Sequence, residues 1–158
     1  MSFFYRLIAT FFYTGYFPMA SGSFASIFGA MIYIIFQNNP VVYFGLLIIF
    51  VILGFPAATY VEKNEGKKDP GCIVIDEVVG MMIAFIGLPL NWPVVLVTFF
   101  VFRAFDMFKI FPGNRFEKIP GGVGIMLDDV MAGLYTNLLM QLALYLATRY
   151  NMPLLTGG

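Results

Sequence analysis

Long apolar stretches alternate with short polar segments along this chain. Three stretches carry no charged residue: Leu7–Val61 with 55 residues, Val78–Phe102 with 25, and Val130–Thr148 with 19. About 18 or more consecutive residues of this kind are enough for a helix to cross a bilayer. The pattern therefore predicts an all-α integral membrane protein.

Turn-forming residues divide these stretches into shorter helices. Asn38-Asn39-Pro40 interrupts the first stretch, and Leu-Pro-Leu-Asn-Trp-Pro at residues 88–93 interrupts the second. Both contain proline, which ends or kinks a helix. We expect a single domain over residues 1–158 with about five to six helices, at residues 3–13, 24–37, 41–61, 76–88, 92–107 and 129–149.

If each interruption is a tight reversal, residues 24–61 and 76–107 form two helical hairpins, and the polar loops share one face. All nine acids and eight of the nine basic residues then lie at that face, with Arg149 opposite. Because basic residues mark the cytoplasmic side, we expect this face to be cytoplasmic in a multi-pass protein. The alternative is that Val78–Phe102 crosses once as a kinked span, which would separate Asp76 from Asp106.

Composition supports the membrane interpretation and excludes several functions. Of the 158 residues, 60% are hydrophobic and 11% are charged, whereas soluble domains carry about 25% charged residues. The net charge is zero, so no nucleic-acid partner is expected. The single cysteine, Cys72, allows no internal disulfide and no cysteine-rich metal site.

Two acidic pairs, Asp76-Glu77 and Asp128-Asp129, each stand at the predicted start of an apolar helix. Helix capping is one explanation, because acids in a first turn satisfy free N–H groups and the helix dipole. A cap needs one acid, however, and a carboxylate at membrane depth costs about 2.5–3.5 kcal/mol. Paired acids therefore also favour a functional site.

Two further acids extend this set. Asp106 lies near the end of its helix, where the dipole disfavours a negative charge, although it could simply pair with Arg103 at i,i+3. Asp69, in Lys-Lys-Asp-Pro-Gly, would by itself be an ordinary turn residue. Carboxylates gathered on one face without histidine or cysteine suit Mg²⁺, Mn²⁺ or Ca²⁺ rather than zinc. We expect metal ligands among Asp76, Glu77, Asp106, Asp128 and Asp129, and catalytic roles for Asp69, Asp76 and Asp129.

Groups suited to an anion accompany the acids. Gly22-Ser23 stands at a predicted helix start, where free N–H groups bind phosphate, although Ser23 would serve equally as a plain N-cap. The cluster Gly-Gly-Val-Gly at residues 121–124 could cradle a phosphate or simply form a flexible loop. Basic side chains could neutralise an anionic substrate. The predicted substrate-binding residues are Gly22, Ser23, Arg103, Lys109, Gly121 and Gly122.

Missing residues and motifs exclude several mechanisms of phosphate hydrolysis. The chain has no histidine to form a phosphohistidine or to act as a general base. Thiol phosphatases use a Cys-x5-Arg motif, but the residue six positions after Cys72 is Val78, so this motif is absent. The chain also has no Asp-x-Asp pair of the kind that forms an aspartyl phosphate. Hydrolysis by a metal-activated water remains, with carboxylates as ligands and base.

Three sequence blocks strongly resemble the phosphatidylglycerophosphatase A family: DPGCIVIDEVVGMMIAF at residues 69–85, FRAFDMFKIFP at 102–112 and GGVGIMLDDVMAGLY at 121–135. TGYFPMASGSFAS, at residues 14–26, is similar to the family's first motif. The resemblance implies a Mg²⁺-dependent helical enzyme of the bacterial inner membrane that removes the terminal phosphate of phosphatidylglycerophosphate. By this resemblance, the acidic site residues of the family correspond to Asp69, Asp76, Glu77, Asp106, Asp128 and Asp129.

Two other functions use similar carboxylates. A cation transporter would place them near the bilayer midplane, whereas here they fall at one end of the predicted helices. A Mg²⁺-dependent phosphatidyltransferase also binds lipid headgroups, but its Asp-x-x-Asp-Gly pattern is missing. The expected partners are a membrane lipid substrate and the bilayer, and the sequence is compatible with an oligomer.

Overall fold

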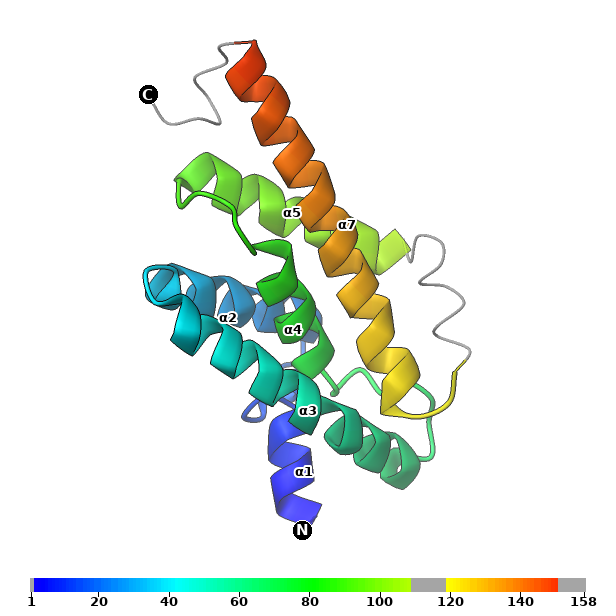
Figure 1. The fold of residues 1–158 in the computed structure, drawn as a ribbon. Helices are drawn as coiled ribbons and strands as arrows, with labels where there is room; N and C mark the ends of the chain where they lie inside the picture. The colour runs from blue at the N-terminus through cyan, green and yellow to red at the C-terminus, as the bar shows by residue number, and fades with distance from the viewer. Residues whose placement is uncertain (1, 109–118, 151–158) are drawn as a thin grey trace.

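The computed structural model describes residues 2–108 and 119–150, and every regular element in this part of the chain is a helix (Figure 1). The all-α prediction is therefore confirmed for the described residues. The elements are α1 (Ser2–Ala9), the short 3₁₀ helix η1 (Thr14–Tyr16), α2 (Ser21–Phe36), α3 (Pro40–Glu65), α4 (Ile75–Ala84), α5 (Trp92–Phe108) and α7 (Gly122–Arg149).

Asparagine caps begin the helices that follow both predicted interruptions. The Asn39 side chain accepts a hydrogen bond from the Val42 amide at 3.3 Å, at the start of α3. Asn91 accepts one from the Val94 amide at 2.8 Å, at the start of α5. Such caps satisfy amides that have no partner inside the helix, and the chain reverses at both places as predicted.

Five predicted helix boundaries were wrong by three residues or more. Helix α2 begins at Ser21 rather than at residue 24, α3 ends at Glu65 rather than at 61, and α4 ends at Ala84 rather than at 88. The first helix ends at Ala9 rather than at residue 13, because Phe11, Phe12 and Tyr13 have left-handed backbones, with φ 41°, 56° and 67°, which cannot continue a right-handed helix. The last helix begins at Gly122 rather than at residue 129. Its first turn packs against α3 so closely that a Cβ at Gly122 would lie 2.3 Å from the Phe55 carbonyl oxygen.

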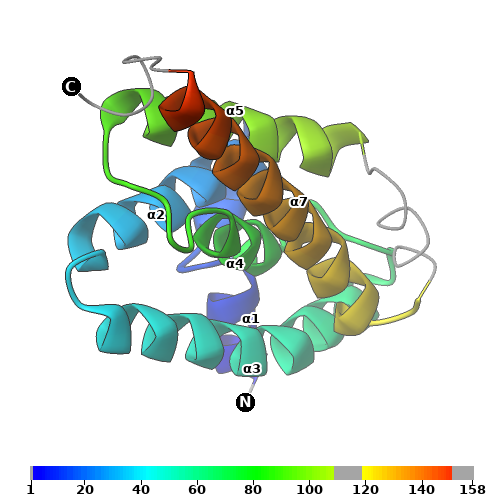
Figure 2. The ribbon, with the colours of Figure 1, turned by 45° about the horizontal axis from the view of Figure 1, so that its top comes forward.

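Helix α4 lies at the centre of the bundle, with α2, α3, α5 and α7 around it (Figure 2). Nine of its ten residues are buried, as expected for a helix that is apolar on every side. Ten residues span about 15 Å, about half of the hydrocarbon thickness of a bilayer. This helix is therefore too short to span the hydrocarbon layer by itself, and its first turn brings Asp76 and Glu77 to one end of the core.

Two glycines allow α4 and α7 to cross at close range. A Cβ at Gly133 would lie 2.3 Å from the carbonyl oxygen of Gly80, and a Cβ at Gly80 would lie 2.6 Å from the carbonyl oxygen of Asp129. Small residues permit this approach of two helix backbones. Gly80 follows Asp76 by four residues and Gly133 follows Asp129 by four, so each acid stands on the same helix face as its glycine. The crossing thereby brings the two acids together.

Helices α3 and α7 are long and apolar enough to cross a membrane, judged by length and composition. Only 28% and 33% of their most apolar windows are buried inside the protein. The remaining residues of these windows are exposed or only partly buried, and Ile48 and Ile52 are among the exposed ones. An apolar surface of this kind on a protein is typical of an interaction with a membrane or another protein.

Candidate active site

A cavity of about 340 Å³ opens beside the first turns of α2 and α4. We call it the acidic cavity, because its wall contains six carboxylates: Asp69, Asp76, Glu77, Asp106, Asp128 and Asp129. They come from the loop before α4, from α4 itself, from α5 and from α7. Asp76 and Asp106 thus line one cavity, as the hairpin predicts and as the single kinked crossing does not.

Three of these acids stand close enough to hold one metal ion. Asp76, Glu77 and Asp129 each offer a carboxylate oxygen, and these oxygens all lie within 4.8 Å of one another. Asp76 Oδ1, Glu77 Oε2 and Asp129 Oδ2 are buried without a hydrogen-bond partner among the described residues. Buried carboxylate oxygens normally have partners, so this donor set fits a hard divalent cation.

The acids of α4 are strongly affected by their surroundings. Burial, together with the negative charges of Glu77 and Asp129, raises the pKa of Asp76 well above its ordinary value. Burial also raises the pKa of Glu77 to about 7, although Arg103 nearby opposes the shift. Desolvation and like charges both disfavour the ionised form. A cation among these groups would relieve both effects.

Capping does not explain the acidic pair on α7. Because that helix begins at Gly122, Asp128 and Asp129 lie in its second turn, beyond the free amides of the first. The expectation that this pair opens the helix was therefore wrong. In α4, Asp76 and Glu77 do lie in the first turn, but the N-cap is Val74, which makes no side-chain capping bond.

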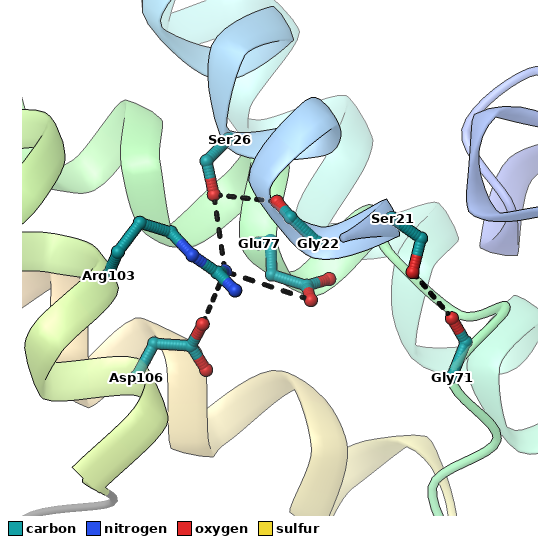
Figure 3. Close-up of polar contacts among 7 residues, drawn as sticks. All are labelled: Ser21, Gly22, Ser26, Gly71, Glu77, Arg103 and Asp106. Carbon is teal, nitrogen blue, oxygen red and sulfur yellow. Dashed lines mark hydrogen bonds and ion pairs between the residues drawn. The ribbon is translucent and has the colours of Figure 1, made fainter. Parts of the chain in front are cut away.

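Arg103 lies among the acids and the first turns of α2 (Figure 3). Its guanidinium pairs with Asp106, one turn along α5, as the i,i+3 alternative expected. The same Nη1 lies 4.0 Å from Glu77 Oε1 and donates a long hydrogen bond of 3.4 Å to Ser26 Oγ. Ser26 is buried and donates to the Gly22 carbonyl oxygen at 2.9 Å. Three helices therefore hold Arg103 in place.

Gly22 leaves room for the Glu77 and Arg103 side chains beside α2. A Cβ at that position would lie 2.2 Å from Glu77 Oε1 and 3.2 Å from Arg103 Nη1. The first turn of α2, at Ser21 and Gly22, lines the acidic cavity, where helix N-termini offer free N–H groups to an anion. The Ser21 hydroxyl also bonds the Gly71 carbonyl oxygen at 3.0 Å, which ties α2 to the loop before α4.

Two wall residues have a left-handed backbone. Ala20, the N-cap of α2, has φ 53°, and Asp69 has φ 47°. Non-glycine residues in this region of backbone space are strained, and such strain gathers at functional sites. Since Ala20 is the N-cap, the alternative role of Ser23 as a cap was wrong; Ser23 lies in the first turn.

The other predicted binding residues have different positions. Gly122 packs against α3 and donates its amide to Thr59 Oγ1 at 2.8 Å. Gly121 lines a neighbouring cavity, whereas Gly124 lines the acidic one. Lys109 lies outside the described residues. Sequence reasoning missed Ser21, Ser26, Lys68 and Gly71 as neighbours of the site.

The fold and the cavity together define a class of protein: an all-helical protein with two helices of bilayer length and a buried carboxylate site at one end. Within that class, the family model of phosphatidylglycerophosphatase A matches residues 7–144. The chain belongs to the phosphatidylglycerophosphatase A family and is a phosphatase.

Individual relatives agree with this assignment. Phosphatidylglycerophosphatase A of Escherichia coli is 33% identical, over 82% of this chain and 77% of its own. The Haemophilus influenzae protein of the same name is 36% identical, over 82% of each chain. A Bacteroides thetaiotaomicron protein with the provisional name phosphatidylinositol-3-phosphatase is 35% identical, over 87% of this chain and 91% of its own. No solved structure matches the chain.

Proposed function

We propose that this protein is a Mg²⁺-dependent lipid phosphatase that hydrolyses phosphatidylglycerophosphate to phosphatidylglycerol and inorganic phosphate. The family and two of the relatives support this substrate. The third relative is named for phosphatidylinositol 3-phosphate. Both lipids carry a terminal phosphomonoester, which is hydrolysed, and a phosphodiester, which stays with the diacylglycerol. The reacting group is thus the same in both.

The observation that carries the proposal is the charge of the acidic cavity. Six carboxylates line it, with two basic side chains, Lys68 and Arg103, beside them. A phosphomonoester dianion would be repelled from such a wall unless cations lie between. The three unpartnered oxygens of Asp76, Glu77 and Asp129 are where we expect Mg²⁺ to bind. Mg²⁺ prefers a few carboxylates together with waters and substrate phosphate.

The chain's own residues then have distinct roles in the proposed reaction. When bound, Mg²⁺ would polarise the phosphoryl oxygens and acidify a water. Arg103 and the first-turn amides of α2 hold the transferred phosphoryl group. Hydrolysis joins the water oxygen to phosphorus and breaks the ester P–O bond. Asp69 takes a proton from the water and then gives it to the leaving alkoxide of phosphatidylglycerol, so that it returns to its ionised form. Asp106 positions Arg103, and Asp128 completes the negative wall.

We place the protein in the bacterial inner membrane, with α3 and α7 as spans and the acidic cavity at the cytoplasmic face. The exposed apolar surface of both helices supports their role as membrane spans. The lysines that follow α3, at positions 67 and 68, support a cytoplasmic location of the acidic cavity, since basic loops stay on the cytoplasmic side. Acids at one end of the helices, rather than at their middle, also disfavour a cation transporter.

Metal dependence provides the test. Purified protein in neutral detergent is mixed with phosphatidylglycerophosphate, and released phosphate is measured with EDTA, with EDTA followed by excess Mg²⁺, and without additions. We expect no release above background in EDTA and full recovery with Mg²⁺. Unchanged turnover in EDTA would rule out the metal mechanism, and no turnover under any condition would rule out the substrate.

A further inference from the structure

A second cavity, of about 580 Å³, adjoins the acidic one. It lies between the C-terminal end of α3 and the start of α7, and three lysines line it: Lys63, Lys67 and Lys68. We call it the lysine cavity. Glu62 is the single acid on its wall among the described residues, so the wall carries an excess of positive charge. Its electrostatic character is the opposite of that of the acidic cavity.

The two cavities are contiguous. Lys68 lines both of them. The start of α7 also connects them, because Gly121 lines the lysine cavity and Gly124, one turn later, lines the acidic cavity. Because the cavities are neighbours, we expect a ligand with two anionic groups joined by a short linker to reach both, with one group beside the proposed metal site and the other among the lysines.

In the proposed orientation, the lysine cavity lies at the end of the apolar helix α3, where we expect phospholipid phosphates. The apolar helix α3 ends at Glu65, and its C-cap, Gly66, turns the chain with φ 63° directly before Lys67. Helix α1 packs at the same end, where Arg6 lies 3.6 Å from Glu65. Its exposed aromatic side chains, Phe3 and Phe4, suit the membrane interface. Lysines at the end of an apolar helix extend toward lipid headgroups.

We infer that the lysine cavity binds the phosphodiester of the lipid substrate while the acidic cavity binds the terminal phosphomonoester. This inference rests on the proposed function and adds a determinant of specificity to it. An enzyme built in this way prefers lipids that carry both phosphates over phosphatidate, which has only a phosphomonoester. The headgroup between the two phosphates matters less, because neither cavity recognises it by charge.

A selectivity measurement tests the inference. Phosphate release is followed in neutral detergent micelles with Mg²⁺, from phosphatidylglycerophosphate and from phosphatidate with the same acyl chains. The parent is compared with a Lys63→Gln/Lys67→Gln double variant and with Lys63→Arg/Lys67→Arg, which keeps the charge. Arg149→Gln, at the far end of α7, is a further control that removes one positive charge away from both cavities. Lys68 is left unchanged because it also lines the acidic cavity.

We expect the parent to favour phosphatidylglycerophosphate in kcat/KM, and the glutamine variant to lose roughly tenfold of that preference, mainly through KM. The arginine variant and Arg149→Gln should keep it. An equal loss on both lipids would mean that the lysines attract anionic surfaces in general, and no loss would mean that they do not contact substrate. Either result would overturn the subsite while leaving the phosphatase assignment intact. Failure of the parent on both lipids would overturn both.

Discussion

Asp76 and Asp129 are buried beside each other on different helices, and each has an oxygen without a hydrogen-bond partner among the described residues. Asparagine has nearly the same shape as aspartate but no negative charge, so it separates a structural role from a charged one. We expect Asp129→Asn and Asp76→Asn to fold like the parent or more stably. Phosphate release should fall by about 10²–10⁴-fold.

The matched control is Glu65→Gln, since Glu65 is a half-exposed acid on α3 that pairs only loosely with Arg6. Such surface pairs contribute little to stability, so its activity and melting temperature should stay close to those of the parent. The measurements are phosphate release at saturating Mg²⁺ and thermal unfolding in detergent. Normal turnover by both aspartate variants would show that the site has been misplaced.

Single residues also show where sequence reasoning succeeds and where it stops. The six acids could be predicted because charge is rare in this chain and its placement beside apolar helices is conspicuous. Ser26 could not, because a serine among small residues of an apolar helix suggests only packing. Its contact with Arg103 joins positions 77 residues apart, which no local pattern reports.

At the scale of elements, the crossing of α4 and α7 assembles the site. We expect Gly133→Ala to push the helices apart, because its Cβ would lie 2.3 Å from the Gly80 carbonyl oxygen. Overpacking of this kind costs about 1–3 kcal/mol. The melting temperature should fall by several degrees, and activity should fall further than stability does, because Asp129 moves with α7.

Gly45 provides a control of the same type on α3. A Cβ there meets nothing within 4 Å, so Gly45→Ala adds a methyl group without a clash. Alanine favours a helix over glycine by about 0.5–1 kcal/mol, and the melting temperature should rise slightly with activity unchanged. Thermal unfolding and phosphate release are measured on both variants. Equal behaviour of the two would contradict the close crossing.

Helix boundaries reveal a related limit of prediction. The interruptions before α3 and α5 were predictable because proline and asparagine act locally. The start of α7 was not, because Gly-Gly-Val-Gly has low helix propensity and is typical of a loop. Packing of Gly122 against Phe55 and Thr59 overrides that propensity, and it extends the helix past the acids to Gly122.

For the whole molecule, the testable expectation is its orientation in the membrane. With Cys72 replaced by alanine, single cysteines are introduced at Lys67, beside the cavities, and at Pro89, in the turn between α4 and α5. We expect an impermeant thiol reagent to label position 67 only from the cytoplasmic side and position 89 only from the opposite side. Labelling of both from one side would contradict the proposed orientation, although it would leave the six-acid cavity unaffected.

The left-handed backbone at Ala20 has a consequence for how this protein would respond to selection for heat resistance. Glycine adopts that conformation without the penalty of about 1–2 kcal/mol that a Cβ incurs. Ala20→Gly is therefore among the simplest stabilising changes available, and it lies on the wall of the acidic cavity. The same change loosens the loop that holds the first turn of α2 against Glu77 and Arg103. Variants selected for survival at high temperature should thus include enzymes with weaker catalysis. At this one position, a gain in thermal stability would come with a loss of turnover.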